Sequence, residues 1–192
     1  MYRSKEILGR PEWSFNRSVF KSIGYSDDDL KRPLIGIANS WNELVPGHYN
    51  LRQMAEAVKK GIYRAGGTAC EFGVIAGCDG TAQGHAGMHY ILPSRDLIAN
   101  DIETMVEIHH LDAVVLLGSC DKIVPGMLLA AARLDIPVIF MGCGPMLGGK
   151  VFDNRKSDLT SMSEGLGMLR AGKIDEPTFN SLEDVCGPTC GS

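Results

Sequence analysis

The sequence lacks the features that would tie it to a membrane or to a polyanionic partner. No apolar run approaches the ~18 residues that a membrane span requires, and the first ten residues, MYRSKEILGR, contain no apolar stretch of the kind found in export signals. Lysine and arginine form no block, and 19 basic against 23 acidic residues leave a net charge of −4. We therefore expect a cytoplasmic protein that binds a small molecule rather than nucleic acid or a membrane.

The chain also lacks the setting in which cysteines form a disulfide framework. In a chain without an export signal, free thiols or metal ligands are more common than disulfides. The chain ends within the Cys- and Gly-rich string CGPTCGS, which we interpret as part of a longer protein. The six cysteines are Cys70, Cys78, Cys120, Cys143, Cys186 and Cys190.

Short apolar runs alternate with helical patterns along the chain. Four runs have the composition of strands buried in a parallel sheet, and amphipathic or apolar segments of helical length lie between and after them. This alternation predicts an α/β fold, a doubly wound and mostly parallel sheet flanked by helices. We expect residues 1–32 to form an N-terminal arm and residues 33–192 to form the α/β domain, truncated at its C-terminal end. The predicted strands are 33–38, 68–76, 112–118 and 136–141, and the predicted helices are 51–65, 94–109, 126–134, 158–170 and 177–185.

Residues capable of metal chemistry follow two of the predicted strands. Cys78 and Asp79 follow the second strand, and Cys120, Asp121 and Lys122 follow the third. Open α/β sheets bind ligands at the carboxyl ends of their strands, and we expect these two strands to be adjacent, so that the loops meet. Carboxylates suit Mg²⁺ and thiolates suit iron, so the set predicts two neighbouring metal sites. The alternative is that the aspartates cap helices and Cys120 is a small buried hydrophobe, which explains any one residue better than it explains the set.

Four segments of the chain resemble the N-terminal part of the dihydroxy-acid dehydratase and 6-phosphogluconate dehydratase family. They occur in the family's order and cover nearly the whole chain, and the strings CDK-x-x-PG and DG-x-A-x-GH-x-GM are specific. The segments are IGIANSWNELVPGHYNLR, GCDGTAQGHAGMHYILPSRDLIA, SCDKIVPGMLLAAARLDIPVIF and PTCGS.

The resemblance implies an iron-sulfur, Mg²⁺-dependent hydro-lyase that converts a 2,3-dihydroxy carboxylic acid to a 2-keto acid. Cys120 would be a cluster ligand, Asp79 and Asp121 would bind Mg²⁺, and Lys122 would bind the same ion as a carbamate. The PGH, CDG and CDK strings together are most similar to the dihydroxy-acid dehydratases of branched-chain amino-acid biosynthesis. A sugar-acid dehydratase, acting on an aldonate or 6-phosphogluconate, is the alternative within the family. A homo-oligomer, either a dimer or a tetramer, is expected.

The chain departs from the family pattern in the loop after the first strand. Many members carry a cluster cysteine there in a PCN string, whereas this chain has PGH, with Gly47 and His48 in place of the last two residues. The cluster type, [2Fe–2S] or [4Fe–4S], is therefore open. Cys78 could replace the missing thiolate, although a cysteine that is merely buried is the interpretation we favour from the sequence. His48, His85 and His89 could contact substrate, but loop histidines are more often solvated or bonded to backbone.

The resemblance places the catalytic base in a C-terminal barrel domain that this chain lacks. We therefore assign no catalytic residue to the chain and expect it to be inactive by itself. The competing hypothesis from another functional class is a non-catalytic scaffold or binding domain that keeps these loops only for structure.

Overall fold

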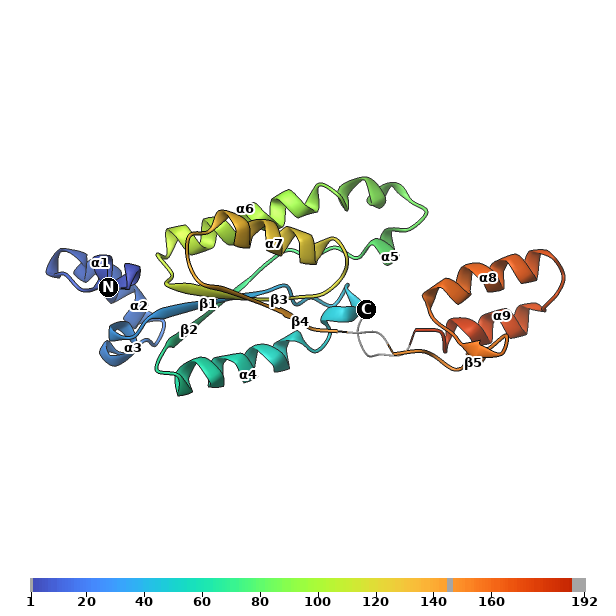
Figure 1. Cartoon of the computed structure of the whole chain (residues 1–192), viewed down its shortest axis with the longest axis horizontal. Coiled ribbons are helices and arrows are strands. Elements are labelled where there is room, and N and C mark those ends of the chain that lie inside the picture. Colours follow the sequence, from blue (N-terminus) through green and yellow to red (C-terminus); the bar gives the residue numbers. More distant parts are fainter. Residues whose placement is uncertain (1, 145–146, 188–192) are drawn as a thin grey trace. The chain divides into compact units, whose positions relative to one another are not determined.

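A computed structural model describes residues 2–144 and 147–187 of the chain (Figure 1). The chain divides into two compact units, Met1–Cys143 and Gly144–Ser192. The first unit contains all the predicted metal ligands. The predicted arm boundary at residue 32 lies inside this unit and stays a prediction.

The first unit is built on a parallel sheet, which confirms the predicted α/β class. The described strands have the order β2-β1-β3-β4 and pair in parallel throughout. The predicted second strand ends early, at Gly73 rather than residue 76, because its partner β1 ends opposite it at Asn39. The strands are β1 (Leu34–Asn39), β2 (Thr68–Gly73), β3 (Ala113–Gly118) and β4 (Val138–Gly142).

The expectation that the second and third strands are adjacent was wrong, because β1 lies between β2 and β3. The connection through α6 (Ser94–Ile108) carries the chain past β1 to its other side. A right-handed crossover can place the next strand on either side of the first, depending on which face its helix covers, and strand composition does not encode that choice. The chain therefore adds β2 on one side of β1 and β3 on the other. The carboxyl ends of β1 and β3 form a topological switch point, where such sheets bind ligands.

Helices cover both faces of the sheet (Figure 1). Helix α4 (Leu51–Arg64) lies on one face, and α6 and α7 (Ile123–Arg133) lie together on the other. Each buries an apolar stripe with helical spacing, such as Ile98, Ile102 and Val106 of α6, which are fully buried. Each such side chain contributes about 1.5–3 kcal/mol through burial.

Helices α6 and α7 approach closely at Gly126. A Cβ added at this position would lie 3.0 Å from the carbonyl oxygen of Arg95 and 3.0 Å from Cβ of Ile98. This contact holds the N-terminal half of α7, and with it the loop that precedes the helix, against α6.

The start of the N-terminal helical segment is tied to the sheet through the carboxylate of Asp112. Asp112, just before β3, accepts hydrogen bonds from the Ser4 backbone N–H (2.9 Å), the Ser4 hydroxyl (2.6 Å) and the Leu34 backbone N–H (2.7 Å). Leu8 and Leu30 are buried in the same core as α6. The segment consists of α1 (Arg3–Leu8), η1 (Pro11–Trp13), α2 (Ser14–Ser22) and α3 (Asp27–Lys31).

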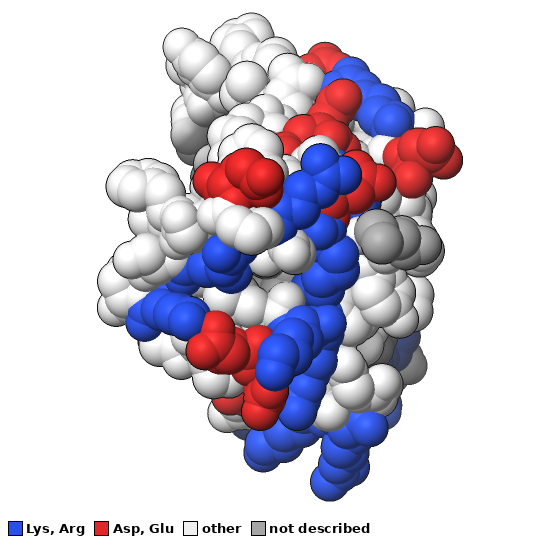
Figure 2. Space-filling model, turned by 90° about the vertical axis from the view of Figure 1, so that its left-hand side faces the viewer, with Lys and Arg blue, Asp and Glu red and all other residues white. Residues whose placement is uncertain are grey.

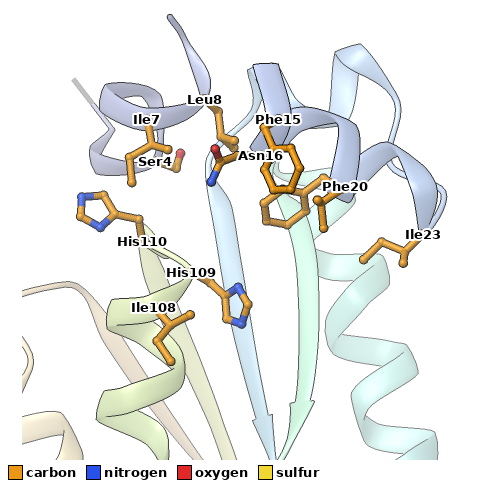
Figure 3. A pocket seen from close by; sticks show the side chains of 11 residues that line it. Ser4, Ile7, Leu8, Phe15, Asn16, Phe20, Ile23, Ile108, His109 and His110 are labelled. Carbon is orange, nitrogen blue, oxygen red and sulfur yellow. The ribbon is translucent and has the colours of Figure 1, made fainter. Parts of the chain in front are cut away.

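Two surface features of the first unit lie at this N-terminal end. A mostly apolar pocket of about 340 Å³ lies between α1, α2 and the end of α6, with the strands running away from it, so it sits at the edge of the sheet opposite the carboxyl ends (Figure 3). A second groove beside it is lined in part by four basic residues, Lys5, Arg10, Arg17 and Lys31. Figure 2 shows basic and acidic side chains side by side on the end face.

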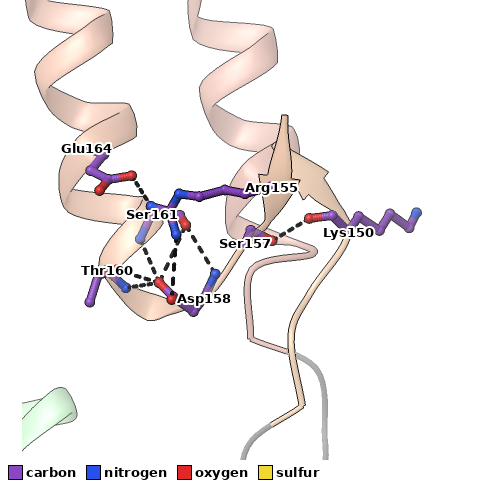
Figure 4. Close-up of polar contacts among 7 residues, drawn as sticks. All are labelled: Lys150, Arg155, Ser157, Asp158, Thr160, Ser161 and Glu164. Carbon is purple, nitrogen blue, oxygen red and sulfur yellow. Dashed lines mark hydrogen bonds and ion pairs between the residues drawn. The ribbon is translucent and has the colours of Figure 1, made fainter. Parts of the chain in front are cut away.

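The second unit is a small two-stranded hairpin followed by two helices, which confirms the helices predicted in this region. Asp158 caps the first of these helices by accepting from the backbone N–H groups of Thr160 (2.9 Å) and Ser161 (3.1 Å), and Arg155 pairs with Asp158 and Glu164 (Figure 4). Cys186 is buried, and Cys190 lies outside the described residues. The elements are β5 (Val151–Phe152), β6 (Arg155–Lys156), α8 (Leu159–Arg170) and α9 (Glu176–Glu183).

Across residues 2–144 and 147–187, no helix has both the length and the apolar character needed to cross a membrane.

We predict that Asp112→Ala lowers the free energy of unfolding by about 2–4 kcal/mol, because it leaves three hydrogen-bond donors without their acceptor. Urea denaturation followed by circular dichroism measures the change. Asp135→Ala is the matched control, since Asp135 is an exposed aspartate in the loop before β4 and its loss should change stability by less than about 0.5 kcal/mol. Equal effects of the two substitutions would contradict the anchoring role of Asp112.

Candidate metal centre

The residues after β2 cross toward the loop that follows β1. The Val74 backbone N–H donates to the Asn39 carbonyl (3.0 Å), and the Asn42 side-chain amide donates to the Ala76 carbonyl (3.1 Å). These bonds lead Cys78 and the short helix α5 (Asp79–Ala82) toward the loop after β3. The two loops therefore meet although their strands are not neighbours.

Two thiols and a carboxylate form one group where the loops meet. One ligand atom each from Cys78, Asp79 and Cys120 lies within 4.8 Å of the others, and all three residues are partly buried. The Cys120 sulfur is 3.8 Å from one oxygen of Asp79 and 3.8 Å from one oxygen of Asp121. The structure thus brings together every predicted ligand from both loops, while their roles stay predictions.

Lys122 joins the two aspartates. Its Nζ is 2.6 Å from Oδ2 of Asp79 and 2.6 Å from Oδ2 of Asp121. These hydrogen bonds raise the pKa of Lys122 to about 12, and the bond from Lys122 lowers the pKa of Asp79. The ammonium therefore occupies the position between two carboxylates that a bound cation would take.

The thiols of Cys78 and Cys120 are coupled. The hydrogen bond between them lowers the pKa of Cys78 and raises the pKa of Cys120, with burial as a further cause for Cys120. The pair therefore loses its first proton more readily than its second, as expected when one thiolate accepts a hydrogen bond from the neighbouring thiol.

Cys120 has a left-handed backbone conformation, with φ of +72°. This conformation is uncommon for a residue with a side chain and costs about 1–3 kcal/mol, so the surrounding contacts must hold it. Its carbonyl accepts a hydrogen bond from the Val124 N–H (3.1 Å) in the first turn of α7, which fixes the turn from its C-terminal side.

His48 fixes the same turn from its N-terminal side. It ends the short helix η2 (Pro46–His48) and is fully buried, with Nε2 3.0 Å from the Ser119 backbone nitrogen and Nδ1 2.6 Å from the Ser40 carbonyl oxygen. The Ser119 N–H can only donate, so Nε2 accepts and Nδ1 carries the proton. Burial lowers the pKa of His48, which favours this neutral form. His48 therefore links the loops after β1 and β3 at the switch point.

The other loop histidines are bonded differently. His85 accepts from the Gly87 N–H at Nδ1 (3.0 Å) and has Nε2 3.0 Å from the Thr81 carbonyl, so it caps the short helix η3 (Ala86–Tyr90). His89 is exposed on that helix. The sequence did not separate His48 from these two residues, because all three lie in or near Gly-rich loops and only the packing shows which one is buried.

The residues present fit a pair of neighbouring metal groups. Two sulfurs supply soft ligands for iron, and the two carboxylates that flank Lys122 supply hard oxygen ligands on the adjoining side. The hydroxyl oxygen of Ser119, next to Cys120, is buried without a hydrogen-bond partner among the described residues. An unsatisfied buried hydroxyl is uncommon in a folded protein and is consistent with a polar group bound nearby.

Known proteins with similar sequences point to one family. Residues 32–192 match the family described as dihydroxy-acid/6-phosphogluconate dehydratase N-terminal. A dihydroxy-acid dehydratase from Ignicoccus hospitalis is 58% identical over 139 residues, covering 72% of this chain and 25% of that protein. Dihydroxy-acid dehydratases from Pyrococcus abyssi and Caldicellulosiruptor bescii are 52% and 55% identical over 190 residues, covering 99% of this chain and 34% of each protein. The chain thus spans about a third of the length of these curated relatives.

We predict that His48→Ala lowers the free energy of unfolding by about 2–4 kcal/mol, because it removes a buried side chain and the partners of two backbone groups. His48→Gln, which keeps a side-chain acceptor and donor, should recover part of the loss. Urea denaturation measures both effects, with His109→Ala as the control because His109 is exposed. A loss no larger than that of His109→Ala would show that His48 does not stabilise this edge of the sheet.

Proposed function

Because the chain belongs to the dihydroxy-acid/6-phosphogluconate dehydratase family, we propose that the protein containing it is an iron-sulfur, Mg²⁺-dependent dehydratase. It converts a 2,3-dihydroxy carboxylic acid to a 2-keto acid. The supporting observation is that Asp79, Cys120 and Lys122 converge from two non-adjacent strands, with the amine 2.6 Å from the Asp79 carboxylate. A scaffold that kept these loops only for structure would not require thiols, carboxylates and an amine to face one point.

The roles proposed for the residues follow their chemistry. Cys120 holds the iron-sulfur cluster through its thiolate, and Asp79 and Asp121 hold Mg²⁺ through their carboxylates. When bound, the iron supplies a Lewis acid for the departing 3-hydroxyl, and Mg²⁺ offsets the charge of the substrate carboxylate. His48 holds the backbone on which Cys120 sits. The base that removes the proton at C2 is assigned to the part of the relatives' length that this chain does not span.

Lys122 is proposed to bind Mg²⁺ as a carbamate. An ammonium about 4 Å from a divalent cation would be repelled by on the order of 8 kcal/mol at an effective dielectric constant near 20. It would also occupy the carboxylate oxygens that Mg²⁺ needs, as it does in the structure. A carbamate instead supplies an oxygen ligand and reverses the charge. Mass spectrometry of the intact, metal-loaded protein under CO₂ tests this through an added mass that the Lys122→Ala variant lacks.

The proposed substrate is the branched-chain dihydroxy acid of branched-chain amino-acid biosynthesis, because the similar relatives carry the name dihydroxy-acid dehydratase. The enzyme is proposed to act as a homo-oligomer in the cytoplasm. Reducing conditions there keep thiols such as those of Cys78 and Cys120 free. Assays of the full-length, anaerobically purified enzyme with 2,3-dihydroxyisovalerate, several aldonates and 6-phosphogluconate test the assignment. Turnover of the sugar acids alone would reject the branched-chain substrate, and turnover of none would reject the dehydratase.

We predict that Asp79→Asn lowers kcat of the full-length enzyme by about 100-fold or more, because it removes a charged Mg²⁺ ligand. The matched control is Asp135→Asn, an exposed aspartate on the same sheet unit, which should keep wild-type kcat. Added Mg²⁺ should partly restore the variant if affinity for the ion is the main loss. Wild-type turnover by Asp79→Asn would remove Asp79 from the proposed site.

A further inference from the structure

The loop after β1 leaves a thiolate unaccounted for. In many family members a cysteine follows proline in this loop, but here the position is Gly47, which is buried in η2 and has no side chain to offer. Cys120 by itself gives the cluster one protein thiolate among the described residues of this edge. A second thiolate ligand at this edge would therefore have to come from another cysteine.

The other described cysteines lie away from Cys120. Cys70 is within β2, level with Gly36 of β1, and its sulfur faces the Thr68 carbonyl. Cys143 is buried in the core beneath α4 and donates to the Met141 carbonyl (2.9 Å). Cys186 belongs to the second unit. Within the described residues, Cys78 is the cysteine grouped with Cys120.

The backbone fixes Cys78 in its place. Its carbonyl accepts hydrogen bonds from the Thr81 hydroxyl (2.8 Å) and the Ala82 N–H (3.3 Å), and the preceding Ala76 carbonyl is tied to Asn42 in the loop after β1. A Cβ at Gly80 would lie 3.4 Å from the Cys78 sulfur, so the short α5 turn passes close to it. These contacts hold the thiol on the Cys120 side.

We infer that Cys78 is a second protein thiolate ligand of the iron-sulfur cluster, taking the place of the thiolate that Gly47 cannot supply. The inference rests on the proposed function. A tetrahedral metal with two thiolates at about 2.3 Å holds their sulfurs about 4 Å apart, and the Cys78 and Cys120 sulfurs lie within 4.8 Å of each other. One iron can therefore bind both with little movement, which leaves the Asp79 carboxylate for Mg²⁺. This reverses the interpretation favoured from the sequence, in which Cys78 was a buried cysteine without a ligand role.

The test compares three single substitutions in the full-length protein. Wild type, Cys78→Ser, Cys120→Ser and Cys70→Ser are reconstituted anaerobically with iron and sulfide, and iron, acid-labile sulfide and visible absorbance are measured per chain before and after a chelator. Cys70→Ser is the matched control, because Cys70 is also partly buried and lies within β2, the strand that leads to Cys78, but is outside the group. Cys78→Ser and Cys120→Ser should each lose the cluster about tenfold faster or more than wild type, and Cys70→Ser should not.

A second measurement uses only the wild-type protein, so it does not depend on whether a cysteine variant folds. In the wild-type protein, cluster loading should protect Cys78 and Cys120 together from iodoacetamide, as read by mass spectrometry, while the labelling of Cys70 stays unchanged.

The outcomes separate this inference from the proposed function. A Cys78→Ser protein that keeps the wild-type cluster through the chelator challenge, or a Cys78 that alkylates equally fast with and without cluster, overturns the inference while leaving the dehydratase in place. A wild-type protein that assembles no cluster overturns both.

Discussion

The proposed metal centre depends on the contact between two loops that leave non-adjacent strands. Lys122, after β3, donates to Asp79, after β2, at 2.6 Å, and β1 lies between the two strands. In water such an ion pair would contribute little, since exposed pairs are worth about 0–1 kcal/mol. Here other hydrogen bonds hold the backbone before each residue, so the two side chains meet without a large loss of side-chain freedom. In the proposed metal-loaded form, Mg²⁺ would take the place of the ammonium between the carboxylates.

The strand between the two loops supplies their support rather than a ligand. The loop after β1 is bonded to the loop after β2 through Asn42 and to the loop after β3 through His48. His48 is buried against Ser40 and Ser119. In family members with a cysteine at the position of Gly47, the same loop is implied to bind the cluster directly. In this chain the loop after β1 is proposed only to hold the backbone of the two neighbouring loops in position. The second thiolate is proposed to come from Cys78, in the loop after β2.

Much of the fold was predictable from local pattern. The apolar run 112–118 has the composition of a strand buried on both faces, and β3 is indeed Ala113–Gly118. The candidate ligand residues could be proposed from the sequence as a set, because a thiol, two carboxylates and an amine at the ends of strands have few explanations as packing. The order of the strands was not predictable in the same way, and the prediction that β2 and β3 are adjacent was wrong, because the side on which a crossover places its strand depends on helix packing.

The sequence by itself determined which elements form and which residue types follow each strand, because apolar periodicity and turn residues act over a few neighbouring positions. Only the tertiary structure decided which of these residues meet. Cys70, Cys78 and Cys143 each lie in or just after a strand, yet of these three only Cys78 is grouped with Cys120. His48, His85 and His89 likewise lie in or near Gly-rich loops in the sequence, yet only His48 of the three is buried, through contacts with a segment 71 residues away in the chain.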